Sequence, residues 1–322
     1  MDDRVASFFM LVPGPWHEVQ EVSRALAEQG VFDAPSGTEA ALPGSFRVEV
    51  VQDDQLATGF TWGRQGHLAK EVLGRVATCP RAAVVEFRGR LNEHAPEVAR
   101  LGRALRDAGG VAVRMEASGA ASTWELWLER LESGDLFRVY ESAVLLVEGD
   151  DDVMFTCGMH HFDLPDAQVV GIADSNEAIA WLDAFCLHQL AERPALMSGH
   201  TFRPDADAQR RNFVRWPDHR HHPDDGRHNP FGVWRFRKPG SPGIQPARLA
   251  LTMIPSLASV LMAAEKSAGR PLKRREVEEI VANCATIAME PHDALMLERS
   301  RGYADIEPEL AWEQWQIVRA VT

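Results

Sequence analysis

Residues 7–12 read Ser-Phe-Phe-Met-Leu-Val, and Pro13-Gly14-Pro15 follows them directly. A short apolar run that ends at turn residues predicts a buried strand. Apolar residues then recur at helical spacing and stop at Gly30, which predicts a helix over 16–29. The same alternation continues along the chain, with strands expected at 46–51, 82–87 and 111–115 and helices at 67–76 and 93–108. This pattern predicts an α+β protein built on a ferredoxin-like or related sheet with helices on it.

The pattern changes after residue 136. Two strand-like runs, 137–147 and 153–157, flank an acidic turn, and a helix is expected from Ser175 to about Glu192. Residues 197–246 are dense in Arg, His, Asp, Pro and Gly and show little apolar periodicity, so they predict an irregular connection. Helical patterns fill the remainder of the chain, with one helix expected over 273–288. We therefore predict an α/β sandwich-type domain at 1–196, an Arg/His-rich irregular connection at 197–246 and a small helical C-terminal module at 247–322.

The composition is that of a folded globular protein. The chain has 322 residues, of which 45% are hydrophobic and 25% charged. The formal net charge is −13, but it is unevenly spread: residues 1–199 hold 16 basic and 31 acidic side chains, whereas residues 200–240 hold 9 basic and 5 acidic. An acidic chain argues against nucleic acid as a partner. The basic segment 200–240 is expected to dock on an acidic surface of its own chain or of a second subunit.

The sequence also indicates a compartment. Met1-Asp2-Asp3-Arg4 lacks the basic start of a secretory signal, and the apolar run that follows is too short to span a membrane. The four cysteines are widely spaced, which predicts buried free thiols rather than a disulfide framework. We expect a cytoplasmic protein with no membrane partner.

Part of the chain resembles a known family. An apolar strand ending in Glu148 precedes FTCGM at 155–159, FDLPDA at 162–167 and, after a helix, SGHTF at 198–202. With these residues, the stretch 137–204 resembles the bacterial domain-of-unknown-function 4261 family, although Asp163 and His200 stand where that family has Gly and Asp. Residues 299–316, which include GYADIEPE at 302–309, are similar to a small helical segment of uncharacterised bacterial proteins. Such families often accompany secreted toxins as immunity or accessory proteins, so the resemblance implies a binding role.

The segment 200–228 carries the residues most suggestive of chemistry. Histidine and aspartate side chains are ligands for zinc, manganese or iron, and the candidate metal ligands are His219, His221, His222, His228 and Asp218. Arginines suit bidentate contacts with phosphate or carboxylate, and the candidate anion-binding residues are Arg203, Arg211, Arg215 and Arg227. A solvated polar loop is the alternative interpretation, since no helix with an HxxxH or HExxH pattern orders the histidines.

Two tryptophans near the C-terminus are the last candidates. Trp312 and Trp315 are three residues apart on an expected helix and so share a face. Core packing would explain them, and an exposed pair would make a partner-binding site.

No catalytic nucleophile or phosphate-loop motif occurs, and the sequence predicts no catalytic residue and no cofactor. The leading hypothesis is a non-catalytic bacterial binding protein, such as an immunity or accessory protein, that engages a basic protein partner, for example a toxin, through an acidic surface. The alternative is a metal-dependent or anion-binding enzyme that uses the segment 200–228 and, as cofactor, a divalent metal.

Overall fold

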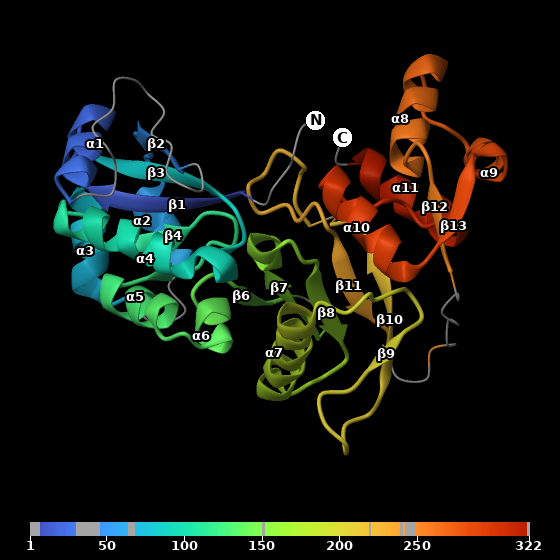
Figure 1. Ribbon diagram of the computed structural model, residues 1–322, viewed down its shortest axis with the longest axis horizontal. Helices are drawn as coiled ribbons and strands as arrows, with labels where there is room; N and C mark the ends of the chain where they lie inside the picture. Colours follow the sequence, from blue (N-terminus) through green and yellow to red (C-terminus); the bar gives the residue numbers. More distant parts are fainter. Residues whose placement is uncertain are drawn as a thin grey trace. The chain divides into compact units, whose positions relative to one another are not determined.

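The chain folds into two compact units (Figure 1). The N-terminal unit comprises Val5–Leu146 and Cys157–Asp163, and the C-terminal unit comprises Val147–Thr156 and Leu164–Thr322. The structure is a computed structural model, and the residues that it describes are 7–29, 46–63, 68–149, 152–218, 220–238, 241 and 249–320.

A five-stranded sheet forms the N-terminal unit, in the order β2-β3-β1-β4-β5. Its strands are β1 (Ser7–Gly14), β2 (Phe46–Val51), β3 (Arg81–Arg88), β4 (Val113–Met115) and β5 (Ala121–Ser122). Each neighbouring pair is antiparallel, and β1 lies between β3 and β4. This is the strand order of a ferredoxin-like βαββαβ fold, with helices inserted between β2 and β3. The predicted α+β class is confirmed.

The helices of this unit are α1 (Val19–Glu28), α2 (Leu56–Gly63), α3 (Lys70–Thr78), α4 (Leu91–Asp107), α5 (Trp124–Glu132) and α6 (Leu136–Glu141). On α4 the predicted apolar face is fully buried at Val98, Leu101 and Leu105. The prediction of a strand from residue 137 is wrong at its start, because Asp135 caps α6 by accepting a hydrogen bond from the Phe137 N–H at 2.9 Å.

A mixed six-stranded sheet centres the C-terminal unit, in the order β6-β7-β8-β11-β10-β9. Its strands are β6 (Leu145–Glu148), β7 (Val153–Cys157), β8 (Asp166–Val170), β9 (Thr201–Phe202), β10 (Arg211–Trp216) and β11 (Val233–Phe236). A 3-10 turn, η1 (Met159–Phe162), follows β7, and α7 (Ser175–Glu192) covers the sheet. Trp181 and Phe185 of α7 contact Phe236 of β11 with ring centroids 4.1 and 4.7 Å apart. β8 and β11 pair in parallel, which brings residue 166 beside residue 233.

The segment 197–246 is therefore not the irregular connection that its composition predicts, because it supplies three strands of this sheet. In β10, Arg211, Phe213 and Arg215 alternate on the buried side, with exposures of 8%, 1% and 7%. Val214 is buried as well, at 6%, so arginine occupies two of the four buried positions and hides the period-two apolar pattern of a strand. The predicted division at 196 and 247 thus differs from the two units of the structure.

The end of the chain is helical, as predicted, but it also contains a two-stranded antiparallel sheet. The elements are β12 (Ala250–Met253), α8 (Leu257–Ala268), α9 (Arg274–Asn283), β13 (Thr286–Met289), α10 (Pro291–Arg301), η2 (Pro308–Leu310) and α11 (Ala311–Ala320). The predicted helix 273–288 ends early, at α9, and its last residues form β13, which pairs with β12. Leu257, Leu261, Val277 and Trp315 belong to the common core of these elements.

Candidate functional site

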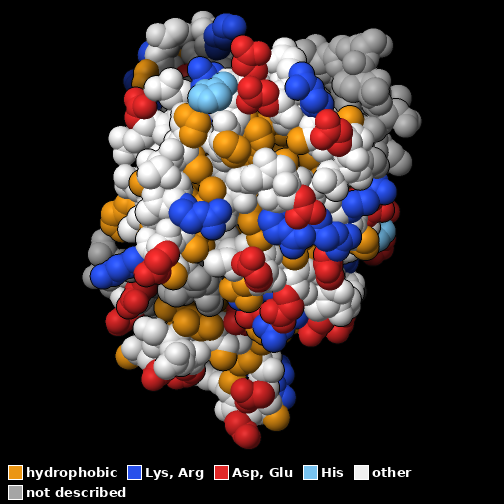
Figure 2. Space-filling model, turned by 90° about the vertical axis from the view of Figure 1, so that its left-hand side faces the viewer, with side chains coloured by type: hydrophobic (Ala, Val, Ile, Leu, Met, Phe, Trp, Pro, Cys, Tyr) orange, Lys and Arg blue, Asp and Glu red, His pale blue; other side chains and the backbone are white. Residues whose placement is uncertain are grey.

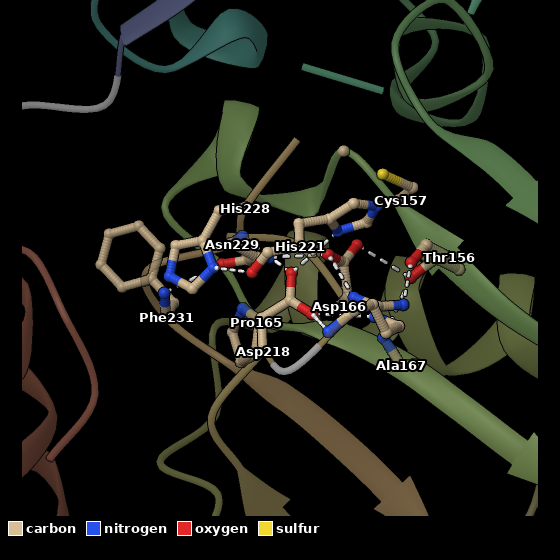
Figure 3. Close-up of polar contacts among 12 residues, drawn as sticks. Thr156, Cys157, Pro165, Asp166, Ala167, Asp218, His221, His228, Asn229 and Phe231 are labelled. Atoms are coloured by element: carbon tan, nitrogen blue, oxygen red, sulfur yellow. Dashed lines mark hydrogen bonds and ion pairs between the residues drawn. The ribbon is translucent and has the colours of Figure 1, made fainter. Parts of the chain in front are cut away.

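Three of the predicted metal ligands meet in the C-terminal unit (Figure 3). Asp218 lies beside His221, whose Nδ1 is 3.3 Å from Asp218 Oδ2, and His228 Nδ1 is 3.2 Å from the carbonyl oxygen of His221. His222 is directed elsewhere: its side chain is 55% exposed and pairs with the exposed Asp224. His219 lies outside the described residues.

A second carboxylate, Asp166, joins this cluster from the first residue of β8, and both aspartates are buried. Asp166 Oδ1 accepts from Thr156 Oγ1 at 3.1 Å, and Asp166 Oδ2 accepts from Asn229 Nδ2 at 3.0 Å (Figure 3). Asp218 Oδ2 accepts from the Asn229 N–H at 3.0 Å. Asn229 thus donates to both carboxylates, one through its side chain and one through its backbone.

Arg220 supplies the positive charge of the cluster. Its Nε donates to Asp218 Oδ1 at 2.9 Å, and its Nη2 lies 3.3 Å from Asp166 Oδ2. The guanidinium also stacks on Phe155, with its carbon 4.5 Å from the ring centroid. All four oxygens of the two carboxylates therefore accept hydrogen bonds from the protein. We call this set of residues (Thr156, Asp166, Asp218, Arg220, His221, Asn229) the aspartate–arginine cluster.

The charge states follow from these contacts. Burial alone would raise the pKa of Asp218, but hydrogen bonds from His221 and Arg220, together with the Arg220 charge, hold that pKa well below its ordinary value. Burial lowers the pKa of His228, and the nearby Asp218 charge opposes this effect. Within the described residues, no group of three His, Cys, Asp or Glu side chains is placed to hold a metal ion. The arrangement is that of a buried ion cluster in which one guanidinium contacts two fully hydrogen-bonded carboxylates.

The predicted anion-binding arginines do not converge, because each has a partner of its own. Arg203 Nη1 donates to the Ala206 carbonyl, and Arg211 Nη1 donates to the Val170 carbonyl. Arg227 forms an exposed ion pair with Asp225. Arg215 lines a cavity of the C-terminal unit.

Of the two interpretations of Trp312 and Trp315, the structure favours core packing over an exposed pair. Trp315 is 1% exposed and belongs to the core of the C-terminal helices, and Trp312 packs against the same core. Spacing of three places both rings on one helix face, and that face is the buried one.

A cavity of about 260 Å³ lies within the C-terminal unit, where β12, α10 and the loop around residue 306 meet β10 and β11. Its walls are mainly apolar, with Leu251, Met253, Leu295, Ile306 and Trp234 among the lining side chains. A few polar groups converge on it. They are Ser198, Arg215, Glu298, Arg301, Asp305, Glu307 and Glu309.

Two glutamates give this cavity its chemical character. Glu307 Oε1 accepts a hydrogen bond from Ser198 Oγ at 2.5 Å, and Ser198 Oγ in turn accepts from the Arg215 N–H at 2.8 Å. Burial raises the pKa of Glu307 to about 7, although the Ser198 hydrogen bond and the Arg215 charge act against it. Burial also raises the pKa of Glu298, against the opposing charge of Arg215. Carboxyl groups with raised pKa values in a cavity mark a candidate functional site.

Sequence reasoning identified Arg215 but neither glutamate. Glu298 lies on α10, 83 residues from Arg215, to which its Oε2 is 3.4 Å away. Glu307 lies within residues 299–316, which are similar to a small helical segment of uncharacterised bacterial proteins. That similarity is the one sequence signal at this position, and it assigns no chemical role to Glu307.

Comparison of the chain with protein-family models, with curated proteins and with solved structures finds no match. The resemblance of residues 137–204 to the domain-of-unknown-function 4261 family therefore stays a prediction. In the part of the chain that the structure describes, no helix is long and apolar enough to cross a membrane.

Proposed function

We propose that the chain is a binding protein whose C-terminal unit binds a small, mostly apolar molecule. The molecule would occupy the cavity between β12, α10 and the strands β10 and β11. The observation that carries this proposal is a 260 Å³ cavity with apolar walls and a few convergent polar groups, the combination typical of small-molecule sites. An apolar cavity of about 150 Å³ is enough to bind benzene, so this cavity has room for a somewhat larger molecule.

The test uses three probes of one shape: cyclohexylmethylamine, cyclohexylmethanol and cyclohexanecarboxylate. Ala294 of α10 lines the cavity, so Ala294→Phe fills part of it. Ala282 is an exposed residue of α9 outside the cavity lining, so Ala282→Phe is the matched control. We expect calorimetry to show binding of at least one probe, weakened about tenfold or more by Ala294→Phe and unchanged by Ala282→Phe. Binding of none of the three, or equal binding to both variants, would contradict the proposal.

A basic protein partner is the second proposal. Its support is the excess of 15 negative charges in residues 1–199. Ion pairs within the N-terminal unit, such as Arg90–Asp163 and Arg114–Glu116, use basic side chains that are already counted in this balance, so the excess remains. On the face drawn in Figure 2, acidic and basic side chains are interspersed rather than gathered by sign. Affinity capture from a bacterial lysate at low and high salt tests this proposal: a basic protein retained only at low salt would support it, and capture without salt dependence would oppose it.

The cytoplasmic location belongs with these proposals. All four cysteines are free in the structure, and Cys157 and Cys186 are buried. Free thiols accord with a reducing compartment. Fractionation of cells that express the full chain would test the location.

A further inference from the structure

The charged side chains around the cavity do not balance one another. Four carboxylates and two guanidinium groups line it, namely Glu298, Asp305, Glu307, Glu309, Arg215 and Arg301. Asp305 is fully engaged: its carboxylate accepts from the N–H groups of Leu257 and Ala258 at 2.9 and 3.0 Å, and Arg301 Nη1 lies 3.4 Å away. Asp305 and Arg301 therefore neutralise each other and hold the first turn of α8.

Arg215 compensates one of the remaining carboxylates. Its Nη2 lies 3.4 Å from Glu298 Oε2, its Nε donates to the Phe231 carbonyl at 2.7 Å, and its guanidinium carbon lies 4.7 Å from the Trp234 ring. Within the described residues, no Lys or Arg forms a salt bridge with Glu307. The lining thus keeps two negative charges in excess, one of them on the enclosed Glu307 and the other on Glu309, which is exposed at the rim.

We propose that the ligand of this cavity is a small organic ammonium ion, an apolar body with one protonated amine, whose amine is held by the Glu307 and Glu298 carboxylates. This inference rests on the proposed function, because it names the chemistry of the molecule that the cavity takes. An ammonium group has three donors and no acceptor, and carboxylate oxygens are its natural partners. The apolar walls, including Leu251 and Leu295, would cover the hydrocarbon body.

The charges of the lining also favour an ammonium ligand over other small molecules. A carboxylate ligand would add a third uncompensated negative charge beside Glu307. A neutral alcohol would make hydrogen bonds but leave the negative charge of the partly buried Glu307 uncompensated. The amine removes that charge imbalance, so it is the ligand for which the cavity is best matched.

The test compares the three probes named above in the full chain at pH 8 and pH 6, by calorimetry. The groups that act on Glu307 are Ser198 and Arg215 from the sheet side, Glu298 from α10 and Glu309 from its own loop. With a pKa of about 7, Glu307 is mostly ionised at pH 8 and mostly protonated at pH 6. We expect the amine to bind at least about tenfold more tightly than the alcohol at pH 8, with the carboxylate weakest, and its advantage to shrink severalfold at pH 6.

Variants assign the effect to the glutamate. Glu307→Gln keeps the shape of the side chain and removes its charge, so it should abolish the preference for the amine over the alcohol. Glu279→Gln, at an exposed position of α9 outside the cavity lining, is the charge control and should leave the preference intact. Equal binding of amine and alcohol to the unaltered chain, or an amine preference that survives Glu307→Gln, would overturn the ammonium proposal and leave the cavity as a binding site. Binding of no probe would overturn the proposed function as well.

Discussion

The C-terminal unit contains two groups of buried or enclosed carboxylates, and they differ in how completely the protein satisfies them. In the aspartate–arginine cluster, every oxygen of Asp166 and Asp218 accepts a hydrogen bond, and Arg220 lies between the two carboxylates. In the cavity, the Glu307 carboxylate accepts one hydrogen bond from the described residues, donated by Ser198 Oγ.

The electrostatic consequences are opposite. The contacts of Asp218 hold its pKa well below the ordinary value, whereas burial raises the pKa of Glu307 to about 7. A carboxylate whose contacts are complete stabilises the fold and has little capacity for a ligand. A carboxylate left short of partners costs stability and keeps that capacity, which is the usual distinction between structural and functional groups. Three experiments test this difference between the two groups.

The largest expected effect comes from removing the charge that the two aspartates share. Arg220→Met would leave Asp166 and Asp218, both with fully buried side chains, without their cation. Breaking a buried ion pair by removing one partner typically costs about 3–5 kcal/mol. We expect a loss of this size in the free energy of unfolding, measured with urea. Arg227→Met, which removes only an exposed pair with Asp225, should cost less than about 1 kcal/mol. A loss below about 1 kcal/mol for Arg220→Met would show that the cluster is not structural.

The second effect is on the pH dependence of stability. Because the pKa of Glu307 is about 7 in the folded state and ordinarily 4.5, the folded chain binds more protons than the unfolded chain between these values. The contribution of Glu307 to the free energy of unfolding therefore falls as pH rises from about 4.5 to 7, by at most about 3 kcal/mol. Asp218 acts in the other direction, because its lowered pKa contributes stability that is lost as pH falls below 3.8.

Glu307→Gln should remove the fall between pH 4.5 and 7, so the difference between the two chains isolates this group. Urea unfolding at half-unit pH steps measures it, and Glu279→Gln, on the exposed part of α9 outside the cavity lining, should follow the unaltered chain. Identical slopes for Glu307→Gln and the unaltered chain would mean that the cavity carboxyl is as well satisfied as the aspartates, and the contrast would disappear.

Individual elements show what the sequence could and could not predict. Local patterns sufficed for the N-terminal unit, since β1 is an apolar run and α4 has apolar residues at helical spacing. Phe8, Met10 and Val98 in these elements are fully buried. The pattern failed at β10, where the buried positions include Arg211 and Arg215. The histidine-rich segment stands out in the sequence, but the contact of its Arg220 with the distant Asp166 does not. Asp166 is 54 residues from Arg220, and the two meet because β8 pairs with β11 and β11 pairs with β10, the strand that precedes Arg220. Local periodicity carries no information about such distant pairings.

The smallest expected effect concerns the metal alternative. His222 is 55% exposed, and its partner Asp224 is 93% exposed, so His222→Ala should change the free energy of unfolding by less than about 0.5 kcal/mol. A divalent ion that used the predicted ligands would have to displace Arg220 from Asp218, a contact of 2.9 Å in a buried site. We therefore expect zinc at equimolar concentration to raise the melting temperature of neither the unaltered chain nor His222→Ala. A rise in the unaltered chain that His222→Ala abolishes would instead mean that the histidines rearrange around a metal. The aspartate–arginine cluster would then be one of two states of a binding site, because a cation that binds only the folded chain stabilises it by mass action.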